Sequence, residues 1–88
     1  MNQLDMKGRH AVITGGATGL GFAIAQRVLA SGGKVTLWDR DGAAATRACS
    51  QLGAGAHSVA VDVADHAAVA QAVRQTLAQS PRDRKSVV

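Results

Sequence analysis

Three short apolar runs alternate with three helical patterns along this sequence, and that alternation restricts the possible folds more than any other feature. The runs are rich in Val, Ile and Thr and end in glycine or aspartate, which is typical of strands buried on both faces. They lie at residues 10–14, 34–39 and 57–62, and the helical patterns follow at 19–30, 43–52 and 65–79. Short strand–helix connections repeated in this order predict parallel strands joined by right-handed crossovers. The expected fold is an α/β, three-layer αβα arrangement.

The helical segments carry their own start signals and apolar stripes. Asp41 and Asp65 precede the second and third helices and fit the N-cap position, where a carboxylate accepts a backbone N–H. Apolar residues spaced by four predict the faces that contact the core. These residues are Leu20, Ile24 and Val28 in the first helix, and Val69, Val73 and Leu77 in the third.

Length and charge exclude several function classes. A chain of 88 residues forms one small domain, with residues 1–80 as its body and residues 81–88 as a basic tail that is irregular or truncated. The net charge is +4, but the last seven residues hold three basic residues and one acidic residue and so contribute half of it. With one Trp and one Phe, the chain lacks the basic, aromatic surface that binds nucleic acid. No apolar stretch approaches the roughly 18 residues of a membrane span, and no signal peptide is evident, so we expect a cytoplasmic protein without membrane contact.

The glycine-rich segment after the first strand decides which phosphate-binding template applies. Gly16 and Gly21 have the spacing of a Walker loop, but Phe22 and Ala23 follow instead of Lys and Ser/Thr. The common G-x-G-x-x-G pattern fails as well, because Ile24 occupies its third glycine position. What remains is Thr14-Gly15-x-x-x-Gly19-x-Gly21.

This spacing suits a dinucleotide pyrophosphate. Gly15 allows a tight turn out of the strand, while Gly19 and Gly21 let the backbone approach the phosphates at the positive end of a helix. Asp39 ends the second strand 18 residues after Gly21. That is close to the spacing of about 20 residues for an acid that binds the adenosine ribose. A strand-to-helix turn that needs glycine for steric reasons alone is the weaker alternative.

Taken together, these residues resemble the short-chain dehydrogenase/reductase family. The segment Thr14–Gly21 resembles its T-G-x-x-x-G-x-G loop, Asp39 its acid after the second strand, and Asp62-Val63 its Asp-Val after the third strand. The resemblance implies the N-terminal part of a Rossmann-type domain, with Gly15, Thr18, Gly19, Leu20 and Gly21 at the pyrophosphate and adenosine. It also implies that Asp39 binds the ribose hydroxyls, that Arg40 flanks the adenine or ribose, and that Asp62 and Val63 hold the adenine.

The expected cofactor is NAD rather than NADP. The carboxylate of Asp39 repels a 2′-phosphate, and Thr18 is neutral where NADP-preferring relatives often carry a basic residue. Arg40 argues the other way, because an arginine can pair with a 2′-phosphate. Asp39 and Thr18 together outweigh it.

The chemistry implied by the resemblance needs residues that these 88 do not contain. The family uses Ser, Tyr and Lys, the last two in a Y-x-x-x-K pattern, and this sequence has no Tyr. We therefore expect no catalytic residue and an inactive chain, the dinucleotide-binding N-terminal part of an alcohol/ketone oxidoreductase. A non-catalytic dinucleotide-binding or interaction module is the alternative. In the strand order 3-2-1-4 the tail stands where a fourth strand is due, so Ala11–Ile13 is expected to form an exposed edge that pairs with another chain.

The remaining distinctive side chains have structural interpretations. Cys49 is expected to be a small buried apolar residue, since a single cysteine forms no disulfide framework. His10, His57 and His66 share no metal-ligand spacing and are expected at the surface or at element boundaries, with no metal site. Trp38 is expected to pack against a helix, with stacking on adenine as the second choice.

Overall fold

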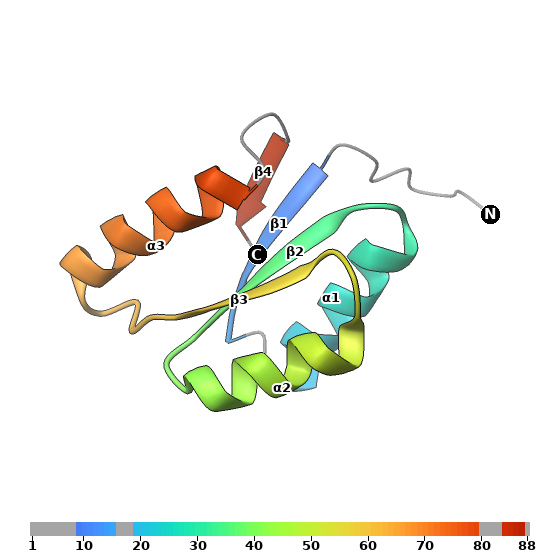
Figure 1. The fold of residues 1–88 in the computed structure, drawn as a ribbon, viewed down its shortest axis with the longest axis horizontal. Helices are drawn as coiled ribbons and strands as arrows, with labels where there is room; N and C mark the ends of the chain where they lie inside the picture. The colour runs from blue at the N-terminus through green and yellow to red at the C-terminus, as the bar shows by residue number, and fades with distance from the viewer. Residues whose placement is uncertain (1–8, 16–18, 80–83, 88) are drawn as a thin grey trace.

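The computed structural model describes residues 9–15, 19–79 and 84–87, which form strands and helices in strict alternation (Figure 1). The elements are β1 (Arg9–Thr14), α1 (Gly19–Ala30), β2 (Lys34–Asp39), α2 (Gly42–Leu52), β3 (Ala56–Ala60), α3 (His66–Gln79) and β4 (Arg84–Val87). The predicted alternation of three parallel strands with three helices is confirmed. β3 ends at Ala60, two residues before the expected bound, which places Asp62 in the following loop. None of the described helices is long and apolar enough to cross a membrane.

The four strands form one parallel sheet in the order β3-β2-β1-β4. α1 and α2 lie on one face of this sheet and α3 lies on the other, which gives three layers (Figure 1). The α/β Rossmann-type architecture expected from the sequence is therefore confirmed. Because all strands run the same way, their carboxyl ends meet at one edge of the sheet.

The C-terminal segment differs from the expectation of an irregular tail. Residues 84–87 form β4, which pairs with β1 from Arg9↔Arg84 to Val12↔Val87. β1 is thus an internal strand, and Ala11–Ile13 are at most 4% exposed. The predicted exposed edge at β1 is wrong. The self-association expected through this strand required its backbone groups to be unpaired on one side, and β4 pairs with them. A four-residue strand is too short to show a period in the sequence, and the backbone groups of β1 supply its partner. The other tail residues, 81–83 and 88, lie outside the described residues.

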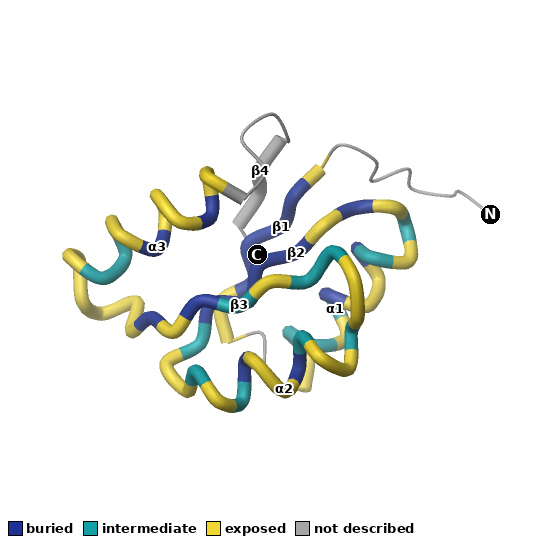
Figure 2. Tube along the Cα trace, in the orientation of Figure 1, coloured by how far each residue is buried: buried dark blue, intermediate teal, exposed yellow. Residues whose placement is uncertain are grey.

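Two hydrophobic clusters hold the layers together. Figure 2 shows the buried residues concentrated along β1 and β2. The larger one joins the sheet to α1 and α2, and the smaller one joins the opposite face to α3 through Val12, Trp38, Val59, Val61 and Ala72. The packing of Trp38 against a helix is confirmed.

The predicted apolar stripes are only partly correct. Val28 is buried, but Leu20 is 78% exposed, and Val73 and Leu77 are also exposed. A helix with 3.6 residues per turn rotates a stripe spaced by four away from its contact face. On α3 the chain instead buries Ala72, three residues after the half-buried Val69, and then Thr76.

His10 is the clearest departure from the expected surface positions. Its side chain is fully buried, and Nε2 lies 2.6 Å from Oγ1 of Thr36 on the neighbouring strand. The pairing of β4 with β1 makes this residue internal, and the threonine hydroxyl provides a polar partner for the imidazole. His57 and His66 are exposed, as expected.

Cys49 is half-buried and packs against the larger hydrophobic cluster. Burial raises the pKa of its thiol, and a hydrogen bond with Ser58 acts weakly in the opposite direction. The thiol therefore stays protonated near neutral pH and serves as a small packing residue.

The first residue of α2 is a point of close approach between helix and sheet. A Cβ added at Gly42 would lie 2.9 Å from the Cβ of Ala60, at the end of β3. We expect Gly42→Ala to destabilise the fold by about 1–3 kcal/mol, because neither atom belongs to a flexible side chain. Urea denaturation measures this cost.

A matched variant isolates the contact. Ala60→Gly removes the opposing Cβ, so Gly42→Ala should cost much less in that background. Equal costs in the two backgrounds would show that the approach of these atoms does not limit residue 42.

Candidate functional site

A cavity of about 280 Å³ opens where the carboxyl ends of β1, β2 and β3 meet. We call it the strand-end cavity. Its lining residues are Thr14, Gly15, Trp38, Asp39, Arg40, Val61, Asp62 and Val63. Five of these, Gly15, Asp39, Arg40, Asp62 and Val63, were predicted from the sequence as site residues, and the fold brings them together from three separate loops. Their roles in binding stay predictions.

Backbone hydrogen bonds fix the relative positions of the three strand ends. Gly15 N–H donates to the Trp38 carbonyl at 2.7 Å, and Val61 N–H donates to the Asp39 carbonyl at 3.0 Å. Gly15 has a φ of 65°, in the left-handed region that favours glycine. The chain therefore turns out of β1 at the edge of the cavity without strain.

The carboxylate of Asp39 is held beside the N-terminus of α2. Its Oδ1 accepts a hydrogen bond from Asp41 N–H at 3.0 Å. Asp41 in turn is the N-cap of α2, and its Oδ1 accepts from Ala44 N–H at 3.0 Å. The predicted cap is confirmed, and the same short turn orients Asp39.

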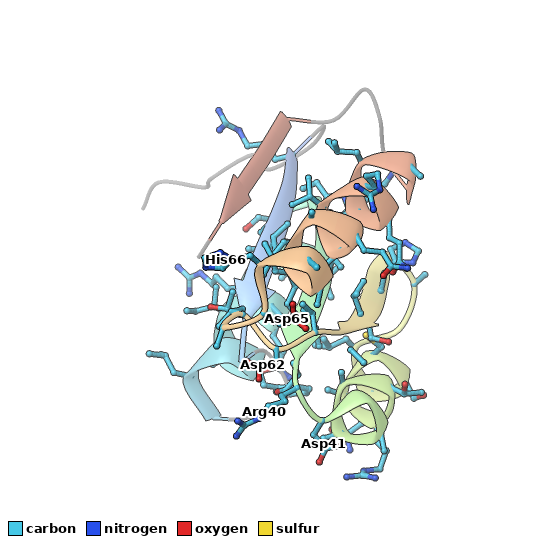
Figure 3. The ribbon with its side chains drawn as sticks, turned by 90° about the vertical axis from the view of Figure 1, so that its left-hand side faces the viewer. Arg40, Asp41, Asp62, Asp65 and His66 are labelled. Carbon is cyan, nitrogen blue, oxygen red and sulfur yellow. The ribbon has the colours of Figure 1, made fainter. Side chains whose placement is uncertain are left out.

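The loop after β3 is ordered by two further aspartates. Asp62 Oδ1 accepts from Ala64 N–H at 3.0 Å, and Asp65 Oδ1 accepts from Ala67 and Ala68 N–H at the start of α3. The predicted cap at Asp65 is confirmed. Figure 3 shows Arg40 and Asp62 on the same side of the molecule, on the loops that follow β2 and β3. A cation and a carboxylate thus flank one opening.

The glycine loop contributes to a second hollow. Gly19 begins α1 and lines a groove of about 350 Å³ together with Phe22, Ala44, Arg47, Ala48 and Gln51. Leu20 and Gly21 follow in the first turn of α1 and do not line the strand-end cavity. Thr18 lies outside the described residues. The nine predicted residues are therefore not all brought to one cavity.

Thr14 and Val61 line the cavity but were not among the predicted site residues, and Trp38 was expected in the core, with stacking on adenine as the second choice. Thr14 ends β1, Trp38 precedes the last residue of β2, and Val61 follows β3. The available signal was their position, because each adjoins a predicted site residue at a strand end. In the sequence, Val61 is indicated only as part of the third predicted strand.

Comparison with known proteins identifies the family. The model of the short chain dehydrogenase family matches residues 9–82, which is most of the chain. This chain belongs to the short chain dehydrogenase family. A 2-dehydro-3-deoxy-L-rhamnonate dehydrogenase (NAD(+)) from Sphingomonas sp. (strain SKA58) is 49% identical to it over 71 residues, covering 81% of this chain and 28% of that protein. A 2,3-dihydroxy-2,3-dihydro-p-cumate dehydrogenase from Pseudomonas putida is 42% identical over 65 residues, covering 73% of this chain and 25% of that protein.

Solved structures of short chain dehydrogenases share the fold. A 3-ketoacyl-(acyl-carrier-protein) reductase from Brucella melitensis, complexed with NADH, superposes with a TM-score of 0.83 at 37% identity, covering 86% of this chain and 31% of that one. The 88 residues thus span between a quarter and a third of these relatives. Within the family fold they correspond to its N-terminal part.

The turn that carries Asp39 can be tested through its cap. We expect Asp41→Ala to lower the free energy of unfolding by about 1 kcal/mol, because Ala44 N–H loses its acceptor. Asp41→Asn keeps an acceptor at the same place and should be nearly neutral. Urea denaturation of both variants measures the difference, and equal losses would show that the side chain does not act as a cap.

Proposed function

We propose that these residues bind the adenosine half of a nicotinamide dinucleotide, as the cofactor-binding part of an NAD-dependent short-chain oxidoreductase. The observation that carries the proposal is the strand-end cavity, where residues from three loops meet at the carboxyl edge of a parallel sheet. Its volume of about 280 Å³ suits one part of a dinucleotide rather than the whole molecule.

Asp39 is the proposed ribose ligand. An ionised carboxylate has about four lone-pair sites, so it can accept from ribose hydroxyls in addition to the Asp41 N–H. Asp41 fixes the orientation of the acid before any ligand arrives. Such preorganisation lowers the entropy cost of binding.

The proposed adenine site is formed by Asp62 and Val63. Both residues line the cavity, and the turn from Asp62 to Ala64 fixes the loop backbone. Val63 is 56% exposed and offers an apolar surface that a base could cover. Arg40 lines the same cavity and is proposed to flank the ribose or adenine.

The pyrophosphate is proposed to lie at the start of α1. Gly19, Leu20 and Gly21 form the first turn of this helix, whose N–H groups favour an anion, and Gly15 lies in the turn out of β1. Thr18 belongs to the proposed set from the sequence alone.

NAD is the proposed cofactor, in preference to NADP. Asp39 would repel a 2′-phosphate, whereas Arg40 in the same cavity would attract one. The Sphingomonas relative is named as NAD(+)-dependent, and the Brucella structure contains NADH. Both observations support NAD as the cofactor, as the charge of Asp39 indicates.

Bound nicotinamide dinucleotide would supply hydride transfer. The residues of this chain would hold and orient the adenosine end and exclude water beneath it. No phenol is among them, because the sequence contains no Tyr. We propose that any proton transfer to an alcohol or ketone requires residues beyond these 88.

A non-catalytic dinucleotide-binding or interaction module is the second candidate, because the strand-end cavity would serve either function. The coding sequence distinguishes the two functions. A frame that continues into Asn-Ala-Gly and then Tyr-x-x-x-Lys supports the oxidoreductase, and a frame that stops after Val88 supports the module.

Calorimetric titration with NAD and with ADP-ribose tests the proposal. We expect weak binding of similar strength for the two ligands, because the proposed contacts address only the adenosine and pyrophosphate. Absence of binding would refute the proposal. Tight binding of NAD that ADP-ribose does not match would require nicotinamide contacts, which the proposal does not include.

Removal of the negative charge of Asp39 tests its proposed contact with the ribose. We expect Asp39→Asn to weaken ADP-ribose binding about tenfold and to narrow the preference over 2′-phospho-ADP-ribose. Asp65→Asn makes the same charge change outside the cavity and leaves a capping side chain, so it should bind as the wild type does. Equal effects of the two substitutions would point to net charge rather than to a ribose contact.

A further inference from the structure

Trp38 connects three parts of the molecule that the proposed nucleotide site depends on. Its carbonyl accepts the N–H of Gly15, where the glycine loop begins, and Asp39 is the next residue along β2. Its side chain lies on the opposite face from α1 and α2, in the cluster that includes Val61. Trp38 and Val61 both line the strand-end cavity.

The indole is anchored by a hydroxyl from α3. Trp38 Nε1–H donates to Thr76 Oγ1 at 3.1 Å, and Thr76 Oγ1 donates to the Ala72 carbonyl at 2.8 Å. The second bond directs the hydroxyl hydrogen along the helix and leaves an oxygen lone pair for the indole. Trp38 and Thr76 are 7% and 3% exposed, so water does not replace either partner.

We propose that Thr76 is a positioning residue for the nucleotide site, acting through the indole of Trp38. The inference rests on the proposed function. Thr76 lies in the third turn of α3 and is not a lining residue of the strand-end cavity. Its hydroxyl fixes the indole, and the indole fixes the end of β2 that carries Asp39 and receives Gly15.

The packing around the indole explains why a single hydroxyl matters. A tryptophan ring held only by apolar contacts can shift along its neighbours, whereas a hydrogen bond at Nε1 selects one ring orientation. Val61 contacts the same cluster and is bonded through its N–H to the Asp39 carbonyl. A displaced ring would therefore disturb β2 and the loop after β3 together.

The test uses the 88-residue chain, ADP-ribose as the probe and Trp38 as the only tryptophan. Thr76→Val replaces the hydroxyl with a methyl of similar size, and Thr76→Ser retains the hydroxyl. We expect Thr76→Val to weaken ADP-ribose binding about tenfold and to shift the Trp38 emission maximum. Thr76→Ser should restore the affinity to within about twofold of the wild type and restore the emission.

Leu52→Ala is the control for stability alone. Leu52 ends α2 and packs against the other hydrophobic cluster, outside both hollows. This variant should unfold more easily yet bind ADP-ribose with wild-type affinity when folded. A matching loss of affinity in Leu52→Ala would show that general destabilisation explains the effect of Thr76→Val.

A second background covers the case in which Thr76→Val does not fold. Trp38→Phe removes the N–H, so it leaves no buried donor unpaired, and it should also weaken ADP-ribose binding. Adding Thr76→Val to Trp38→Phe should then cause no further loss in calorimetric affinity.

The outcomes separate this inference from the proposed function. A wild-type chain that does not bind ADP-ribose refutes the proposed function and the inference with it. A wild-type chain that binds, with Trp38→Phe or a folded Thr76→Val binding equally well, refutes the positioning role alone. A further loss in the double variant also refutes it, because Thr76 would then act by another route.

Discussion

The hydrogen bond from Gly15 N–H to the Trp38 carbonyl closes the pairing of β1 with β2 at the carboxyl edge of the sheet, at 2.7 Å. It sets the glycine loop directly beside the acid of β2. Parallel pairing makes this arrangement possible, because each strand ends at the same edge and each is followed by a loop. Val61 repeats the pattern on the other side, where its N–H meets the Asp39 carbonyl. The strand-end cavity is the space that these two bonds leave between three loops.

The two faces of the sheet contribute differently to that cavity. On one face α1 and α2 bring helix starts to the edge, and the cap at Asp41 links the start of α2 to Asp39. On the other face α3 contacts β2 through the hydrogen bond between Thr76 and the indole of Trp38. As a member of the short chain dehydrogenase family, the chain thus holds the N-terminal part of that fold, with helices on both faces of the sheet.

Features that depend on a few consecutive residues could be predicted from the sequence, whereas the order of neighbouring strands at β4 could not. The caps at Asp41 and Asp65 depend on a few consecutive residues, and both were predicted. The burial of His10 and the pairing of β4 depend on which strands lie side by side, and no periodic pattern marks a four-residue strand. The same limit explains why packing against a helix was the first expectation for Trp38 and stacking on adenine only the second. Its place in the site depends on Gly15, 23 residues earlier in the chain.

The central claim, that the strand-end cavity receives the adenosine half of a dinucleotide, is tested most directly by NMR. Backbone amide shifts of the ¹⁵N-labelled chain would be followed during titration with ADP-ribose. The account predicts the largest changes at Gly15, at residues 19–21, at residues 39–41 and at residues 62–64. Changes concentrated at Arg47 and Gln51 in the second groove, or no changes at all, would contradict it.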